Sequence, residues 1–300
     1  PNRPSAAVIR QRIAATVVRR APQVMVKVTG GGRGMGAIAA HFRYICKNGQ
    51  LRIEDDRGVV REGKEAMHDL VDQWRVSGSL IPETSHRREA FNIMLSMPRG
   101  PDPLIVQRAA REFAQAELSD HKYVMVLHDH QANPHVHISV RAVSRLGKRL
   151  NPRKNDLHRW RETFAEKLRG YGVEAEATRQ TTRGQHRQPD PLWRLKAREE
   201  GRLRRAPSTK QSGPQNHPAR KAAVDAWVQI GLALAKSGEA ADRQLAWHVA
   251  RFVKEITASQ LDEQQRKPGR ADQQPRPMHQ PNSRQLPQPQ PTPRDIDPSR

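Results

Sequence analysis

KYVMVLHDHQANPHVHISVRAV, residues 122–143, is the stretch that decides the fold. It contains two apolar, β-branched runs, 122–130 and 135–143, which are separated only by the turn-forming residues QANP. Two runs with such a short connection are typical of a β-hairpin, whose strands are antiparallel. The sequence therefore predicts a sheet that is at least partly antiparallel, and this favours an α+β fold over a doubly wound parallel sheet.

Further strands and helices are predicted on both sides of this hairpin. Apolar runs predict strands at 24–29 and 89–98, and 51–60 is expected to form a second hairpin or an edge segment. The spacing of apolar residues predicts helices at 37–49, 63–78, 103–118 and 156–172. The expected architecture is a central, mainly antiparallel sheet with flanking helices, followed by a small helical region and a disordered tail.

Changes in composition divide the chain into five segments. The tail is rich in Pro, Gln and Arg and has too few large apolar residues to offset the entropy of ordering, so it is predicted to be disordered. The expected segments are a basic arm or short helix at 1–22, the sheet domain at 23–180, a basic linker at 181–215, a helical hairpin at 216–262 and the tail at 263–300.

The charge of the chain points to a polyanionic partner. Its 300 residues include 53 Lys and Arg against 31 Asp and Glu, a net charge of +22. Nucleic acid is the commonest polyanion for such a chain, because each neutralised phosphate releases counterions. The single cysteine, Cys46, excludes an internal disulfide or a Cys-rich zinc site and fits a reducing compartment such as the cytoplasm. No apolar run is long enough for membrane insertion.

Four of the thirteen histidines lie within residues 128–137. Because side chains alternate along a strand, His128 and His130 are expected on one face of the first strand, with Asp129 on the other. His135 and His137 share one face of the second strand. The pattern predicts imidazoles that converge on a divalent metal and leave open coordination positions, rather than histidines on a solvated surface.

A metal beside a bound polyanion can polarise a phosphodiester, but a nucleophile is still needed, either water or a side chain. The chain has three tyrosines, and packing roles are expected for Tyr123 and Tyr171. Tyr44 lies near the end of a predicted helix among the basic residues His41, Arg43 and Lys47. Local sequence alone favours an ordinary packing role for Tyr44 as well.

The glycine-rich stretch GGGRGMG, 30–36, follows a predicted strand and precedes a helix, as in a dinucleotide-binding fingerprint. No further βαβ units follow, and the later hairpin breaks the order of a Rossmann sheet. We expect this loop either to bring the backbone close to DNA or to let the helix that bears Tyr44 pack closely.

Three motifs occur in a fixed order: VMVKVTGGGRGMGAIAAHFRYICKNG, FNIMLSMPRGPD and HDHQANPHVHISV. Together they resemble the conjugative relaxases, or mobilisation nucleases, of the histidine–hydrophobic–histidine (HUH) endonuclease superfamily. The resemblance is to the branch that includes the IncP-plasmid relaxases and the Agrobacterium T-DNA border endonuclease. It covers residues 24–180 and implies an RRM-like palm.

The resemblance implies a role for specific residues. Tyr44 matches the tyrosine that attacks one DNA strand and becomes linked to its 5′ phosphate, and Ser96 matches a serine that holds DNA near the nick. The matching metal ligands are His128, His135 and His137. The family usually has Asp where this chain has His130, so either His130 takes over that role or a bulge returns Asp129; we favour His130.

Cofactor and partners are implied in the same way: Mg²⁺ or Mn²⁺, with Zn²⁺ as a further option, and single-stranded or supercoiled DNA at a transfer origin in the bacterial cytoplasm. Accessory transfer proteins and a coupling protein are the expected protein partners. Besides Arg43 and Lys47, the stretch RLGKRLNPRK after the second histidine strand is expected to flank the site and grip phosphates. Its cations are Arg145, Lys148, Arg149, Arg153 and Lys154.

Three alternatives stay open at this point. A rolling-circle replication or transposition nuclease would share the same chemistry. A non-catalytic DNA-binding accessory factor would keep the charge without needing Tyr44 and the histidines. A metallohydrolase that uses water would make Tyr44 dispensable.

Overall fold

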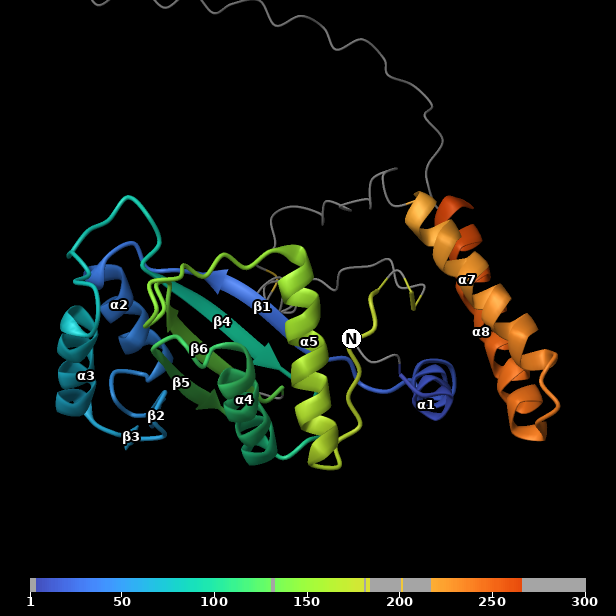
Figure 1. Cartoon of the computed structure of the whole chain (residues 1–300), viewed down its shortest axis with the longest axis horizontal. Helices are drawn as coiled ribbons and strands as arrows, with labels where there is room; N and C mark the ends of the chain where they lie inside the picture. The colour runs from blue at the N-terminus through green and yellow to red at the C-terminus, as the bar shows by residue number, and fades with distance from the viewer. Residues whose placement is uncertain (1–3, 131–132, 181, 184–200, 202–216, 266–300) are drawn as a thin grey trace, which may run out of the picture. The chain divides into compact units, whose positions relative to one another are not determined.

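The computed structural model describes residues 4–130, 133–180, 182–183, 201 and 217–265 (Figure 1). Most of the predicted linker at 181–215 and nearly all of the predicted tail at 263–300 lie outside the described residues. The strands are β1 Met25–Gly30, β2 Ile53–Asp55, β3 Val60–Arg61, β4 Ala90–Ser96, β5 Tyr123–His128 and β6 His135–Arg141. The helices associated with them are α2 Met35–Ile45, α3 Lys64–Val76, α4 Pro103–Glu117 and α5 Lys154–Gly170.

The six strands form one sheet in the order β1-β4-β6-β5-β2-β3, and every neighbouring pair is antiparallel. The predicted hairpin lies near its centre, since β5 pairs with β6 from Tyr123↔Val140 to His128↔His135. The prediction of an α+β fold with a mainly antiparallel sheet and flanking helices is therefore confirmed.

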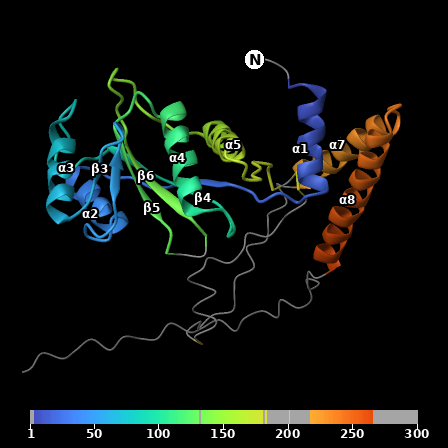
Figure 2. The same cartoon turned by 90° about the horizontal axis from the view of Figure 1, so that it is seen from below.

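Helices cover both faces of the sheet, as Figure 2 shows, with α2 and α3 on one side and α4 and α5 on the other. Alternation decides which side chains face which layer. On one face of β6, the side chains of Val136, Ile138 and Val140 are buried against α4 and α5. The opposite row contains His135 and His137 and shares its face with the core under α2 and α3.

The glycine-rich loop lets the start of α2 pack closely against the segment that contains Pro82 and Glu83. A Cβ on Gly32 would lie 2.4 Å from the Ile38 side chain, and one on Gly34 would lie 2.3 Å from the Glu83 carbonyl oxygen. The first amides of α2 donate to protein carbonyls, Met35 to Pro82 and Gly36 to Glu83. The loop therefore lets α2 pack closely, and the antiparallel sheet excludes the dinucleotide-binding fold.

Gly34→Ala is expected to destabilise the protein by roughly 3 kcal/mol or more, because the new Cβ meets backbone and φ is +100°. Gly58→Ala is the matched control, since φ there is +79° but no atom lies within 4 Å of the added Cβ. Its cost should be about 1 kcal/mol, from the left-handed backbone alone. Urea unfolding measures both, and equal losses would show that packing at Gly34 contributes nothing.

Helix α2 stops at Ile45 because the next turn is left-handed. Lys47, Asn48 and Gly49 have φ values of 48°, 56° and 88°. A non-glycine residue in this region costs of order 1 kcal/mol and persists only where its surroundings fix it. The predicted helix 37–49 was thus too long at its end, and the turn places Tyr44 in the last turn of α2.

Three further helices pack together around a separate small core. They are α1 Ala6–Val17, α7 His217–Ala235 and α8 Ala240–Gln265. Ile13 of α1 packs with Trp227 of α7 and Phe252 of α8, and Arg10 donates to both carboxylate oxygens of Asp242 at 2.6 and 2.8 Å. Of the two alternatives expected for the N-terminal segment, an arm or a short helix, the structure has a packed helix at Ala6–Val17. In the described part of the chain no helix is long and apolar enough to cross a membrane.

Candidate metal centre and nucleophile

Three histidines meet at one end of the β5–β6 hairpin. His128 ends β5 and lies opposite His135, while His137 lies opposite Val126. All three are buried, and each offers a ring nitrogen such that the three atoms lie within 4.8 Å of one another. The convergence predicted from the alternation is thus present in the fold.

Hydrogen bonds define which nitrogen of two of these rings carries a proton. His128 Nε2 lies 2.6 Å from the Ile45 carbonyl oxygen, and His135 Nδ1 lies 3.0 Å from that of Asn133. A carbonyl only accepts, so both nitrogens act as donors, and the other nitrogen of each ring is left for a ligand. His137 Nδ1 is buried and has no hydrogen-bond partner within the described ranges.

The surroundings of His137 and His128 favour the neutral form of both rings. Burial lowers the pKa of His137 to about 3, and neighbouring histidines act in the same direction. Burial is also the main reason that the pKa of His128 is lowered. Neutral imidazole is the form that binds a metal, and three convergent histidines fit a divalent cation with open coordination positions.

Tyr44 stands beside this cluster. Its side chain is 68% exposed, and its ring centroid lies 6.3 Å from that of His137 at an interplanar angle of 82°. The other two tyrosines are engaged elsewhere: Tyr123 is buried on the opposite face of the sheet, where burial raises its pKa to about 12, and Tyr171 donates to Glu112. Of the three, Tyr44 is the one placed to reach a group bound at the histidines.

His41 is a site residue that the sequence analysis did not single out. Its ring centroid lies 6.1 Å from that of Tyr44 and 6.4 Å from that of His137. Burial lowers the pKa of His41 to about 4. The available signal was the i, i+3 spacing on one helix, which puts His41 and Tyr44 on neighbouring positions of its surface.

Ser96 and His130 both lie next to the three histidines. Ser96 ends β4 opposite His135, and its buried Oγ lies 3.4 Å from the Pro134 carbonyl oxygen. His130 is exposed, and its ring centroid lies 5.2 Å from that of His128. The prediction of a strand to residue 130 was wrong, since β5 ends at His128. Alternation therefore no longer assigns a face to His130 or to the exposed Asp129.

The predicted DNA-binding residues separate into two groups. Arg43 is exposed next to Tyr44, and Lys47 is close enough for its charge to contribute to the low pKa of His128, after burial. The stretch 145–154 lies beyond the far end of β6, whose seven residues span about 20 Å. The expectation that this stretch flanks the histidines was therefore wrong.

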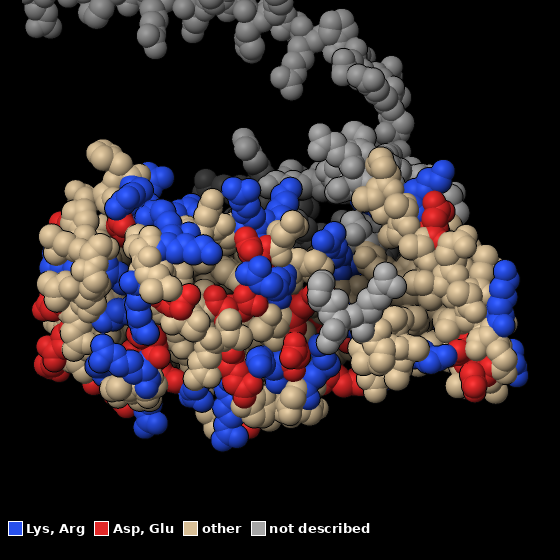
Figure 3. Space-filling view, viewed as in Figure 1, with Lys and Arg blue, Asp and Glu red and all other residues tan. Residues whose placement is uncertain are grey.

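The cations of that stretch are held at the far end of the sheet. Arg145 pairs with Asp56, and Arg149 lies 3.9 Å from Glu89 and donates to the Arg88 carbonyl. Lys148, Arg153 and Lys154 are exposed. Figure 3 shows basic side chains gathered over the loop that enters α5, whereas acidic and basic side chains are mixed over α4 and α5. Any DNA contact there is distant from the histidines.

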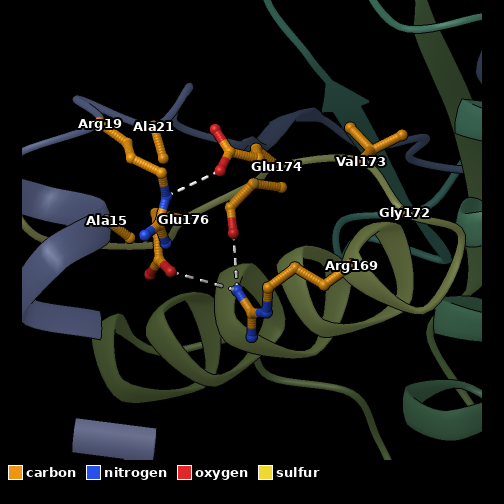
Figure 4. A pocket seen from close by; sticks show the side chains of 9 residues that line it. Ala15, Arg19, Ala21, Arg169, Gly172, Val173, Glu174 and Glu176 are labelled. Carbon is orange, nitrogen blue, oxygen red and sulfur yellow. Dashed lines mark hydrogen bonds and ion pairs between the residues drawn. The ribbon is translucent and has the colours of Figure 1, made fainter. Parts of the chain in front are cut away.

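A pocket of about 180 Å³ lies between α1 and the end of α5 and is unrelated to this site (Figure 4). Its charges are paired with each other: Arg19 with Glu174 at 2.7 Å and Arg169 with Glu176 at 3.8 Å. Arg169 also donates to the Ala175 carbonyl at 2.6 Å. These contacts hold residues 174–176, which follow α5, against Arg19 and the end of α5. Every charged side chain that lines the pocket is therefore paired, and none is free to bind a ligand.

A comparison with known families gives a match over part of the chain. Residues 44–173 match the family model described as "Relaxase: MobA/VirD2-like, nuclease domain". No curated protein matches the chain. The match begins at Tyr44 and includes the three histidines, and the antiparallel α+β fold agrees with it. Over residues 44–173 the chain is therefore similar to relaxases that have a MobA/VirD2-like nuclease domain.

Proposed function

We propose that this protein is a relaxase that nicks one DNA strand at a transfer origin, using Tyr44 as the nucleophile, and thereby starts conjugative transfer in the bacterial cytoplasm. The observation that carries this proposal is the ring of Tyr44 at 6.3 Å from that of His137 within a three-histidine cluster. Accessory transfer proteins and a coupling protein are the partners that this function would require.

The reaction is a transesterification. The Tyr44 oxygen attacks the scissile phosphorus and loses its proton, a bond forms between this oxygen and phosphorus, and the bond from phosphorus to the 3′ oxygen breaks. The 3′ oxygen leaves with a proton as a hydroxyl, and the 5′ phosphate stays on Tyr44. One phosphoester replaces another, so no nucleotide is consumed and the nick can be resealed by the reverse reaction.

His128, His135 and His137 would hold the divalent ion, which when bound supplies charge stabilisation to the phosphoryl oxygens. The protein itself positions the nucleophile relative to the metal ligands. The Ile45 carbonyl accepts from His128, so the residue that follows Tyr44 is tied directly to the histidine cluster. Helix α2 therefore holds the nucleophile and one metal ligand in a fixed relation, which in-line attack requires.

A nicking assay tests this function. The full-length protein is incubated with a supercoiled plasmid that carries the DNA flanking its own gene, with Mg²⁺, Mn²⁺ or EDTA, and is then treated with detergent and protease. We expect metal-dependent open circles nicked at one site, with a free 3′ hydroxyl and a blocked 5′ end. Tight binding without any nick would instead favour a DNA-binding accessory factor.

Lys47→Gln is expected to lower the nicking rate about tenfold at moderate salt, because it removes a cation beside His128 while preserving side-chain length. It should also reduce the salt dependence of binding to single strands by about one phosphate contact. Lys254→Gln, an exposed lysine of α8, is the matched control and should leave both unchanged. Equal effects of the two substitutions would show that Lys47 contributes only general charge.

A further inference from the structure

Two ring nitrogens in the site are buried without a hydrogen-bond partner in the described part of the chain: His41 Nε2 and His137 Nδ1. They belong to neighbouring rings, whose centroids are 6.4 Å apart at an interplanar angle of 73°. A buried polar atom without a partner is costly to a fold, so two of them side by side in a functional site require an explanation.

The other two histidines of the cluster each have a hydrogen-bond acceptor of the kind that His137 lacks among the described residues. His128 and His135 each donate one ring N–H to a backbone carbonyl, those of Ile45 and Asn133. A metal-ligating histidine almost always has such an acceptor, because it fixes the tautomer and the direction of the ring. His137 is the one histidine of the three for which the described residues supply no acceptor.

We propose that His41 is the outer-shell partner of His137: in the metal-bound protein, His41 Nε2 accepts the hydrogen bond that His137 Nδ1–H donates. A neutral imidazole can accept at one nitrogen and donate at the other, so His41 has the required capacity. The two rings are not hydrogen-bonded in this structure, and the contact would form in the protein that holds a metal at His137. The inference rests on the proposed three-histidine metal site.

This arrangement makes His41 a positioning residue. It stands three residues before Tyr44, and its ring lies 6.1 Å from that of Tyr44, so the same helix would orient both the nucleophile and a metal ligand. His130 lies beside His128, with ring centroids 5.2 Å apart, whereas the ring of His41 lies near that of His137. His41 would thus supply the acceptor from another element of the fold.

The test is the affinity of the full-length protein for Mn²⁺, measured by calorimetry on the wild type, His41→Leu and His41→Gln. We expect His41→Leu to weaken binding by about 10- to 100-fold, the usual cost of losing an outer-shell partner. His41→Gln retains a carbonyl that accepts a hydrogen bond and should recover most of the affinity. The melting temperature of metal-free His41→Leu should be equal to or above that of the wild type, since an unpartnered buried nitrogen is removed.

His158→Leu is the matched control, because His158 on α5 also has a buried ring nitrogen without a hydrogen-bond partner in the described chain. It should leave Mn²⁺ affinity unchanged. Three results would overturn the inference: wild-type affinity in His41→Leu, a lower metal-free melting temperature in that variant, or no recovery in His41→Gln. Loss of one nitrogen ligand from the Co²⁺ absorption spectrum of His41→Leu would make His41 a direct ligand and also overturn it.

Failure of this inference and failure of the proposed function give different results. If the wild type binds Mn²⁺ and nicks DNA while His41→Leu binds equally well, only the role of His41 is wrong. If the wild type binds no divalent ion, the proposed metal site is wrong, and the proposed role of His41 is wrong as well.

Discussion

Tyr44→Phe is expected to lower the nicking rate by a factor of about 10³ or more, while DNA binding and Mn²⁺ affinity should stay within about twofold of the wild type. The substitution removes one oxygen from a side chain that is 68% exposed, so the fold should tolerate it. The loss is large because no other tyrosine is placed to replace it: Tyr123 is buried on the other face of the sheet and Tyr171 is bonded to Glu112. Gel analysis of plasmid nicking measures the effect.

Tyr171→Phe is the matched control for that experiment. It removes the same atom from a tyrosine that is also partly exposed, on the far side of the sheet domain, and it should leave nicking unchanged. Nicking that survives Tyr44→Phe would show that water attacks the phosphorus, and the protein would then be a metallohydrolase.

His137→Ala is expected to weaken Mn²⁺ binding by at least about 100-fold, more than the loss of an outer-shell partner costs, because it removes a metal donor itself. Nicking should fall at least as far and should recover only in part at millimolar Mn²⁺. EDTA should have the same effect on the wild type. Calorimetry and the nicking assay, run on the same protein preparations, measure the two losses.

His68→Ala, at an exposed position of α3, is the control for this substitution and should change neither quantity. If His137→Ala kept full activity and metal affinity, the three-histidine cluster would be structural. The proposed charge stabilisation of the phosphoryl group would then need another source.

The centre of the fold was predictable from sequence because local rules determine it. A four-residue connection between β-branched runs requires antiparallel strands, and a period of two puts His135 and His137 on one face. The pairing of β5 with β6 then brings His128 opposite His135. These steps involve neighbours within one hairpin, so no tertiary information was needed.

The environment of Tyr44 could not be predicted in the same way. Whether its helix lies over the histidine face depends on the contact of Gly34 with Glu83 and on packing with α3, both of which are long-range. The role of His41 depends on the same placement. Spacing along the helix indicated only that His41 and Tyr44 are neighbours on its surface.

Adjacency in sequence was misleading at the other end of β6. The stretch 145–154 follows the histidine strand directly, but a strand carries the chain away by about 20 Å over its seven residues. For the N-terminal segment, the sequence left a basic arm and a short helix open, and the structure has helix α1 there. Its apolar residues Ile13 and Val17 pack with residues of α7 and α8, more than two hundred residues later.

The most direct measurement of the central claim is mass spectrometry of the protein after reaction with its plasmid and exhaustive nuclease digestion. The account predicts a peptide containing Tyr44 that carries a nucleotide joined through its 5′ phosphate, formed only when divalent metal is present. Nicked DNA with a free 5′ phosphate, together with an unmodified Tyr44 peptide, would contradict it.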